Sequence, residues 1–164
     1  LATKPSLAAL GRTLRLWALV ILANLAGTAL VASAMASGLI GDDALRAAMI
    51  AVSAKVMTLG AGATFLNAIP AGFFIAILAW TLPGARAQSF LIISAITYLV
   101  ALAGFSHSIV GSSEVFLLIF SGKASALALI AASLIPAILG NLLGGAGIFA
   151  LLAHAQVRSD AEAK

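Results

Sequence analysis

The sequence predicts an all-α membrane protein that crosses the bilayer several times. Hydrophobic residues make up 63% of the 164 positions and charged residues only 9%, whereas a soluble domain usually carries about 25% charged residues. So few charges cannot cover a water-exposed surface, and the outer surface is therefore expected to face lipid. The apolar residues fall into four long uncharged runs. We expect residues 1–164 to form one transmembrane domain.

The uncharged runs give the positions of four membrane-crossing helices. A helix needs about 20 apolar residues to cross the hydrocarbon core. Pro83-Gly84 is a turn signal between the second and third crossings, and Ser121–Lys123 separates the third from the fourth. The runs predict crossings at about 16–38, 61–82, 89–121 and 125–154.

Residues 43–57 lie between the first two crossings and have a different pattern. Apolar residues recur there at helical spacing, while the opposite face carries Arg46 and Lys55. This pattern is typical of an amphipathic helix that lies at the membrane surface. Asp42 or Asp43 is suited to cap its first turn. The apolar positions are Leu45, Met49, Val52 and Val56.

The distribution of basic residues predicts the orientation in a plasma or inner membrane. Cytoplasmic loops are enriched in Lys and Arg. Six basic residues fall on one side of the four crossings and three on the other, so both termini and the loop around Arg86 are expected in the cytoplasm. The six are Lys4, Arg12, Arg15, Arg86, Arg158 and Lys164, and the three are Arg46, Lys55 and Lys123.

Two segments of the sequence match each other without a gap. Residues 21–27 read ILANLAG and residues 138–144 read ILGNLLG, so that Asn24 corresponds to Asn141. Two crossings lie between them, which predicts an inverted repeat of the kind that places a transport site at the repeat interface. A chance match among common membrane residues is the alternative. We interpret both asparagines as packing residues that bond a neighbouring helix, in preference to direct substrate ligands.

The third crossing is too long, and too polar in its middle, to be one straight helix. Residues 89–122 would extend about 51 Å as an α-helix, whereas the hydrocarbon core is about 30 Å thick. Glycines and serines, which are poor helix-interior residues, lie between its two apolar arms. We expect the helix to end near Ala103 and to unwind over 104–113. It would restart near Ser113 as a half-helix, with Ser112 or Ser113 as its cap.

A break of this kind favours a polar pathway. Non-helical backbone at membrane depth survives only inside protein or beside water, and half-helix ends attract anions. His107 is the one ionisable side chain near the middle of this crossing, and such a residue is a functional candidate. The alternative is a neutral imidazole bonded to a backbone carbonyl. Glu114 is either a first-turn helix residue or part of the pore electrostatics, and His154, near the membrane surface, has a structural role.

The composition disfavours several other functions. The chain has no cysteine, so it has no disulfide and no thiolate site. It has five acidic residues and no carboxylate pair near the membrane centre, so no enzyme, metal site or cofactor is expected. The scattered basic residues form no nucleic-acid patch. Asn67–Ala71 departs from the Asn-Pro-Ala turn of water channels. A structural membrane protein and a channel for a neutral solute stay as alternatives.

Three stretches resemble the formate/nitrite transporter family. Residues 104–110, GFSHSIV, resemble the family's Gly-Phe-Glu-His-Ser-Val-Ala loop. Residues 136–145, PAILGNLLGG, resemble its last span, and residues 65–80, FLNAIPAGFFIAILAW, its fourth span with the closing Trp80. The resemblance implies an aquaporin-like six-helix protomer that assembles as a homopentamer with one pore per protomer. This chain, which begins with Leu rather than Met, would supply the third to sixth spans of a longer protein.

The same resemblance implies roles for individual residues. His107 takes the place of the histidine at the pore centre, and Val100 that of a constriction residue that is aromatic in the formate channels. Ser106 replaces the family's Glu, and Gly72 replaces an Asn of the fourth span, so two polar partners of the histidine are lost. The expected pathway residues are Val100, Gly104, Phe105, Ser106, His107 and Ser108, with Gly72, Asn24, Asn141 and Glu114 as a second group.

The resulting hypothesis is transport of small monovalent anions, similar to formate or nitrite, through a central pore. An anion loses its hydration in an apolar constriction, and a weak acid avoids that cost by crossing in its neutral form. Histidine suits such a proton exchange because its ordinary pKa is about 6.5. The hypothesis therefore links passage of the anion to a proton that arrives through His107, or from solvent under its influence.

Overall fold

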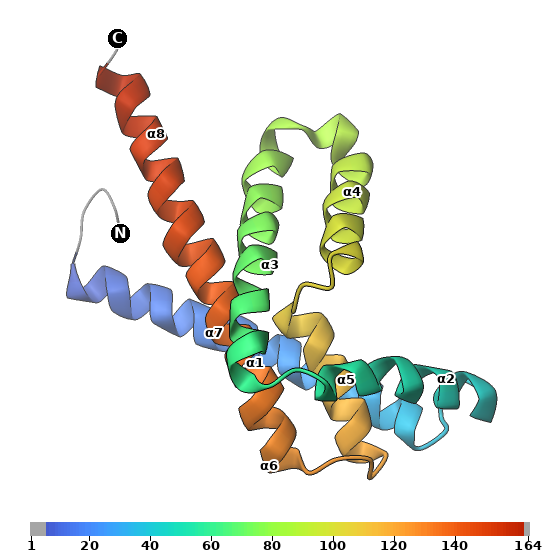
Figure 1. Ribbon diagram of the computed structural model, residues 1–164. Coiled ribbons are helices and arrows are strands. Elements are labelled where there is room, and N and C mark those ends of the chain that lie inside the picture. Colours follow the sequence, from blue (N-terminus) through green and yellow to red (C-terminus); the bar gives the residue numbers. More distant parts are fainter. Residues whose placement is uncertain (1–5, 163–164) are drawn as a thin grey trace.

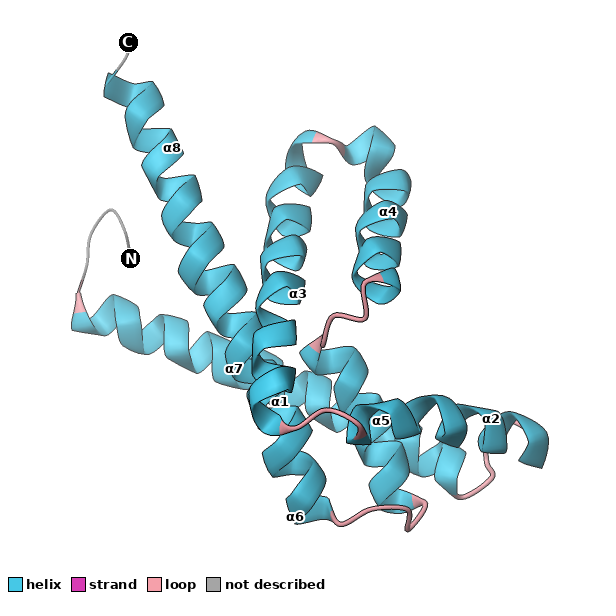
Figure 2. Ribbon diagram, viewed as in Figure 1, coloured by secondary structure: helices cyan, strands magenta, loops and turns pink. Residues whose placement is uncertain are grey.

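The computed structural model describes residues 6–162, which form helices joined by short turns and loops (Figure 1, Figure 2). No strand occurs among these residues. The first five helices are α1 (Leu7–Ala36), α2 (Asp43–Ser53), α3 (Ala61–Thr81), α4 (Ser89–Leu102) and α5 (Ser108–Phe120). The last crossing consists of α6 (Ala126–Leu129), α7 (Ile135–Leu142) and α8 (Ala150–Glu162), joined by π-helical segments at Ile130–Leu134 and Leu143–Phe149. Short 3₁₀ turns lie at Ala54–Met57, Leu82–Gly84 and Arg86–Gln88.

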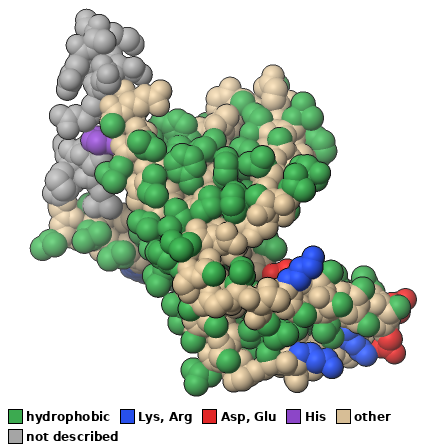
Figure 3. Space-filling model, viewed as in Figure 1, with side chains coloured by type: hydrophobic (Ala, Val, Ile, Leu, Met, Phe, Trp, Pro, Cys, Tyr) green, Lys and Arg blue, Asp and Glu red, His purple; other side chains and the backbone are tan. Residues whose placement is uncertain are grey.

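The outer surface is apolar and the buried core is small. Large apolar side chains are exposed on most of the helices, and they cover much of the face seen in Figure 3. The main buried cluster contains only Val115, Leu118 and Leu129. This distribution is the reverse of a soluble domain and confirms the predicted all-α membrane fold. The helical stretches long and apolar enough to cross a membrane are Leu7–Ala36, Ala61–Gly84 and Ala126–Val157.

Helix α1 begins well before the predicted start of the first crossing at residue 16. Ser6 caps the helix, with its Oγ accepting a hydrogen bond from the N–H of Ala9 at 3.1 Å. Arg12 and Arg15 lie on the exposed surface of the added turns. The uncharged run therefore marks the apolar part of the helix and not its length, because arginine is a good helix former.

Helix α2 and the turn that follows it occupy the segment predicted as an interfacial helix. Asp42 is the cap, since its Oδ1 accepts from the N–H of Leu45 at 2.7 Å. Asp43 instead pairs with Arg46 at 2.8 Å on the surface. The turn after α2 is tied to the last crossing by a 3.2 Å bond from Ser133 Oγ to the Val56 carbonyl. The placement of α2 at the membrane surface stays a prediction.

Helix α3 packs most extensively against α7 and the π-helical segment after it. Glycines allow the two backbones to touch. A Cβ added at Gly72 would overlap the backbone of Asn141, and one added at Gly144 would overlap the carbonyl of Ile69. Gly140 is equally enclosed. Small residues that let helices approach closely are the usual means of association in membranes, and they fix α3 and α7 as one rigid pair.

The third crossing is interrupted, but the interruption is shorter than predicted. α4 ends at Leu102 and α5 already begins at Ser108, so the predicted unwinding over 104–113 and restart near Ser113 are wrong. Ser112 Oγ donates to the Ile109 carbonyl at 2.7 Å, and Ser113 Oγ to the Val110 carbonyl at 2.6 Å. Their hydroxyls are thus satisfied within the helix, and neither serine caps it.

The last crossing is continuous but is not a regular α-helix. Pro136, at the start of α7, has no N–H, so the carbonyl of Ala132 lacks its usual helical partner. The π-helical segment Ile130–Leu134 lies at this point, and a second one, Leu143–Phe149, covers the glycine-rich part. Such segments widen the helix locally and are frequent at functional sites. α8 extends beyond the predicted end at residue 154.

Candidate permeation site

The loop at residues 103–107 separates α4 from α5 (Figure 1). Gly104 has φ +67°, a left-handed conformation that glycine adopts without strain. Its N–H donates to the Ala101 carbonyl at 3.1 Å, and the N–H of Phe105 donates to the Val100 carbonyl at 3.1 Å. This pair of bonds is a Schellman motif, which satisfies the carbonyls at the end of α4. The chain therefore leaves the helix within the crossing with the carbonyls of Val100 and Ala101 paired.

Asn141 of α7 holds the loop from one side. Its Nδ2 donates to the Ser106 carbonyl at 2.9 Å and to the Ala68 carbonyl at 2.8 Å. Its Oδ1 accepts from the N–H of Ser108 at 2.9 Å. One amide group therefore satisfies backbone atoms on both sides of His107, where unpaired groups would be costly in a membrane, and ties them to α3.

Asn67 of α3 holds the loop from the other side. Its carbonyl accepts from the N–H of Ser106 at 3.3 Å, and its Nδ2 donates to the Gly104 carbonyl at 3.4 Å. Pro70 lies inside α3 and has no N–H, which disturbs the hydrogen bonding of the preceding turn. The carbonyls of Asn67 and Ala68 in that turn both accept hydrogen bonds from outside the helix.

His107 is the last residue of the loop and caps α5. Its backbone is extended, with φ −93° and ψ 124°, and its Nδ1 accepts from the N–H of Val110 at 3.4 Å. Its carbonyl accepts from the N–H of Gly111 at 2.8 Å. Because Nδ1 accepts, the hydrogen of the neutral ring lies on Nε2. The half-buried imidazole can therefore offer an N–H donor to a ligand.

A cavity of about 360 Å³ lies beside the loop, between α1, α3, α5 and α7. Most of its wall is aliphatic, and its polar groups come from His107, Ser108 and Asn141. Among the described residues, no Lys, Arg, Asp or Glu lines it. The N-terminus of α5 adds partial positive charge at this place. The lining residues are Ile21, Gly72, Ile75, Ala76, Ala79, His107, Ser108, Ile109, Ile138, Asn141, Leu142 and Gly145.

Only part of the expected pathway set lines this cavity, namely His107 and Ser108 from the first group and Gly72 and Asn141 from the second. The other members of the first group shape the loop instead. Val100 and Gly104 form the Schellman motif, and Ser106 contributes its backbone N–H and carbonyl. The ring of Phe105 stacks on Phe74 of α3 at a centroid distance of 6.2 Å.

Gly72 is a packing position in this chain. An Asn, which the resemblance to the family leads one to expect there, would need space that the Asn141 backbone occupies. Helices α3 and α7 would have to move apart to admit it. The loss of the amide at position 72 is therefore coupled to the close approach of these two helices.

Asn24 and Glu114 do not line the cavity. Asn24 Nδ2 donates to the Val20 carbonyl of its own helix at 2.8 Å, whereas its repeat counterpart Asn141 bonds two other segments. The packing role predicted for Asn141 agrees with these bonds, and that of Asn24 stays a prediction. Glu114 is half-buried on α5, and no cation among the described residues forms an ion pair with it.

Asn67 is the residue that the sequence interpretation missed. In the sequence, Asn67 belongs to a segment that departs from an Asn-Pro-Ala turn and to the stretch 65–80 that resembles the family's fourth span, and neither pattern assigns it a role of its own. The signal that could have revealed it is the proline three residues later, since a proline in a helix interior perturbs the carbonyls of the turn before it. The aliphatic wall formed by Ile75, Ile109 and Ile138 was not predicted either, because it depends on the packing of three helices.

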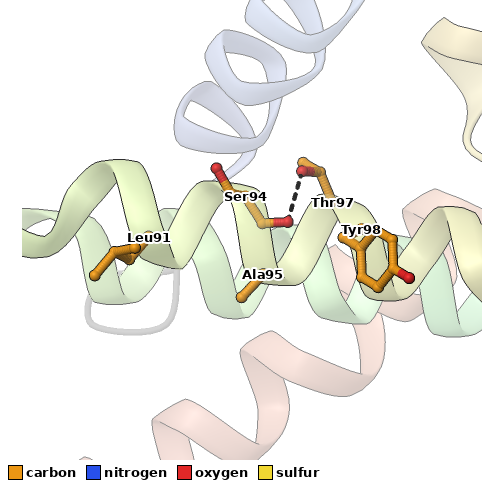
Figure 4. Close-up of a pocket in the computed structure, with 5 residues that line it drawn as sticks. All are labelled: Leu91, Ser94, Ala95, Thr97 and Tyr98. Atoms are coloured by element: carbon orange, nitrogen blue, oxygen red, sulfur yellow. Dashed lines mark hydrogen bonds between the residues drawn. The ribbon is translucent and has the colours of Figure 1, made fainter.

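A larger depression of about 720 Å³ lies along the outer face of α4, but it is not the candidate site (Figure 4). All of its lining residues belong to α4 and are exposed. Thr97 Oγ1 is satisfied inside the helix by the Ile93 carbonyl at 2.7 Å and the Ser94 carbonyl at 3.3 Å. The depression is thus formed by the exposed side of α4 alone. Its lining residues are Leu91, Ser94, Ala95, Thr97 and Tyr98.

The sequence of the chain is similar to known membrane proteins. The family described as formate/nitrite transporter matches residues 2–155. The Escherichia coli (strain K12) inner membrane protein YfdC is 36% identical over 157 residues, which cover 96% of this chain and 51% of that protein. The chain thus spans about half the length of this relative. No solved structure is significantly similar to it. The chain belongs to the formate/nitrite transporter family.

Proposed function

We propose that the full-length protein carries small monovalent weak-acid anions, similar to formate or nitrite, across the membrane, with His107 as the polar centre of the pathway. The observation that carries the proposal is a histidine at the interruption of a membrane crossing, beside a cavity that the same histidine lines. Membership of the formate/nitrite transporter family supports the substrate class. Transport, and not an enzymatic reaction, is the activity proposed.

The charge distribution around the cavity supports entry of an anion. The partial positive charge at the N-terminus of α5 attracts anions, and the neutral imidazole offers its Nε2 hydrogen. The aliphatic wall cannot replace the hydration of an anion over the rest of the path. We therefore propose that the anion enters charged and crosses as the neutral acid, and that His107 donates or directs the proton.

The proposal also covers the oligomeric state of the full-length protein and its orientation in the membrane. The full-length protein would form a homopentamer in a plasma or inner membrane with both termini in the cytoplasm. Arg12, Arg15 and Arg86 support this orientation as described members of the larger basic group. Lys4 and Lys164 lie outside the described residues, and the side chain of Arg158 is also not described. The exposed apolar faces of α1 and α4 are surfaces for lipid or for neighbouring protomers.

A channel for a small neutral solute is the second candidate. The observation that favours it is the cavity wall, which among the described residues has no permanently charged side chain. Such a channel would pass urea or formamide at a rate independent of pH. An anion pathway with a proton step would pass formate faster as the pH falls, and would exclude neutral solutes of the same size.

The test is flux of formate and nitrite into liposomes that contain the purified full-length protein, measured between pH 5 and 8. Wild-type flux is expected to rise as the pH falls. His107→Asn should lower the flux and flatten its pH dependence, because asparagine cannot exchange a proton. His154→Asn is the matched control, since His154 lies in α8 and does not line the cavity.

Two results would count against the proposal. Identical pH profiles for the wild type and His107→Asn would remove His107 from the mechanism. Faster passage of formamide or urea than of formate, with no dependence on pH, would favour the neutral-solute channel.

A further inference from the structure

The loop around His107 keeps its hydrogen bonds although this chain lacks two polar groups that the family resemblance leads one to expect there. Ser106 has no carboxylate, and Gly72 has no amide. Helix α3 nevertheless presents an amide to the loop, at Asn67, more than one turn before Gly72.

We propose that Asn67 is a positioning residue that fixes the loop backbone and thereby holds the imidazole of His107 at the cavity. Its effect on transport rests on the proposed function, whereas its effect on the loop does not. The proposal concerns geometry alone, because Asn67 itself does not line the cavity.

The two bonds of Asn67 act on neighbouring parts of the loop. The Asn67 carbonyl accepts from the N–H of Ser106, and the Asn67 side chain donates to the carbonyl of Gly104. Among the described residues, the Gly104 carbonyl has no other partner. Gly104 is exposed in the described structure, so removal of the amide would leave a backbone carbonyl without a protein partner where α4 ends, which is unfavourable at membrane depth wherever water does not reach it.

The two asparagines divide the loop between them. Asn67 bonds the residues before His107, and Asn141 bonds Ser106 and Ser108 on either side of it. They come from α3 and α7, which glycine contacts lock together. His107 is therefore fixed by a frame that involves neither α1 nor the rest of α4.

The proposal also explains why the amide lies at residue 67. At position 72 the backbones of α3 and α7 touch, so no side chain fits there. At position 67, the backbone carbonyl accepts from the N–H of Ser106 and the side-chain amide donates to the carbonyl of Gly104, so both groups of Asn67 bond the loop.

The first test measures the exposure of the loop in purified full-length protein. Ser106→Cys supplies the only thiol, because residues 1–164 contain no cysteine and any cysteine elsewhere is replaced by serine. The rate of reaction with a thiol reagent should rise about threefold when Asn67→Leu is added, the factor expected for one lost hydrogen bond of average strength in a membrane protein. Asn67→Gln, which keeps the amide, should restore most of the slow reaction.

Thr97→Val is the matched control in the same background. It removes a polar group of similar size from the outer face of α4, where the hydroxyl bonds only its own helix, and should leave the rate unchanged. Should Asn67→Leu fail to fold, Asn67→Ala gives the same readout, because it also removes the amide but introduces no larger side chain. Equal rates with and without the Asn67 amide would overturn the proposal.

The second test separates this proposal from the proposed function. In liposomes, Asn67→Leu should shift the pH midpoint of formate flux relative to the wild type, whereas Thr97→Val should not. If the wild type carries neither formate nor nitrite, the proposed function fails, and the thiol rates still decide the role of Asn67. If the wild type carries formate and Asn67→Leu leaves both the pH profile and the thiol rate unchanged, only the positioning role fails.

Discussion

Helices α4 and α5 are the two halves of one interrupted crossing, yet they have opposite environments. Leu91 of α4 is 67% exposed, whereas Leu118 of α5 is fully buried. Val100 is the one buried residue of α4. α5 carries Glu114, the one acidic residue of the crossing, and three serines against two in α4, and it packs against α1, α2 and the last crossing. The half with the acidic residue is therefore the one inside the protein.

The difference shows what holds the interruption in place. In a membrane the apolar half gains little from leaving lipid, because lipid solvates it as well as protein does. The polar half gains hydrogen bonds and close packing when it is enclosed. Two carbonyls near the end of α4 accept hydrogen bonds from the N–H groups of Gly104 and Phe105, in the loop that directly follows. The first turn of α5 depends instead on another helix, because the N–H of Ser108 donates to Oδ1 of Asn141. The site is thus built mainly on α3, α5 and α7, whereas α4 is largely exposed in the described residues.

The largest expected effect is that of truncating the buried side of α5. Leu118→Ala should lower the free energy of unfolding of the full-length protein by about 2–3 kcal/mol, near the lower end of the usual range because lipid still solvates leucine after unfolding. Leu91→Ala on α4 should change it by less than about 0.5 kcal/mol. Reversible unfolding in mixed detergent measures both. Equal losses would contradict the contrast between the two helices.

A smaller effect on stability is expected for substitutions that act at the end of α4 and at the start of α5, which meet at the loop. Asn141→Leu removes three hydrogen bonds and should cost about 2 kcal/mol, at roughly 0.6 kcal/mol for each bond in a membrane protein. Gly104→Ala should cost about 1 kcal/mol, the price of a left-handed backbone in a residue with a Cβ. Thermal unfolding of both variants shows which of the two loses more stability. A greater loss for Gly104→Ala would mean that α4, and not α5, determines the loop.

The smallest effect is expected for the contact between α5 and α1. Ser112 is fully buried, and its Oγ lies 2.9 Å from Thr28 Oγ1 of α1. Ser112→Ala should cost about 0.6 kcal/mol, the average for such a bond, because Thr28 keeps its bond to the Leu25 carbonyl at 3.1 Å. The double variant with Thr28→Val should add little to Ser112→Ala. A fully additive double variant would show that the two hydroxyls do not interact.

Much of the fold could be predicted from the sequence because lipid imposes a simple rule. Runs without charge mark the crossings, and α3 occupies Ala61–Thr81, where the sequence predicts a crossing at 61–82. The rule is weaker at helix ends, where arginine continues a helix into the interface, as at the start of α1. The interruption was predicted from the length of the third crossing and from the glycines and serines in its middle. Its extent was not, since Ser112 and Ser113 have the composition of a loop but bond back into a helix.

The site could be predicted only in part, because its geometry depends on which helices touch. His107 is recognisable in isolation as an ionisable residue in an apolar crossing. The function of Asn67 depends on the Gly104 carbonyl 37 positions further along the chain, which no local pattern contains. Gly72 was assigned a lost polar role, whereas its structural role is contact with the Asn141 backbone. Such contacts follow from the packing of α3 on α7 and not from periodicity.

The most direct measurement of the central claim is the reactivity of single thiols in sealed vesicles that contain the full-length protein. Ser108→Cys places a thiol at the cavity, and Ser94→Cys places one on the outer face of α4. A membrane-impermeant, anionic thiol reagent should modify Ser108→Cys, formate should slow that reaction, and Ser94→Cys should stay unmodified. Reaction at Ser94→Cys but not at Ser108→Cys would contradict an aqueous path at the interruption.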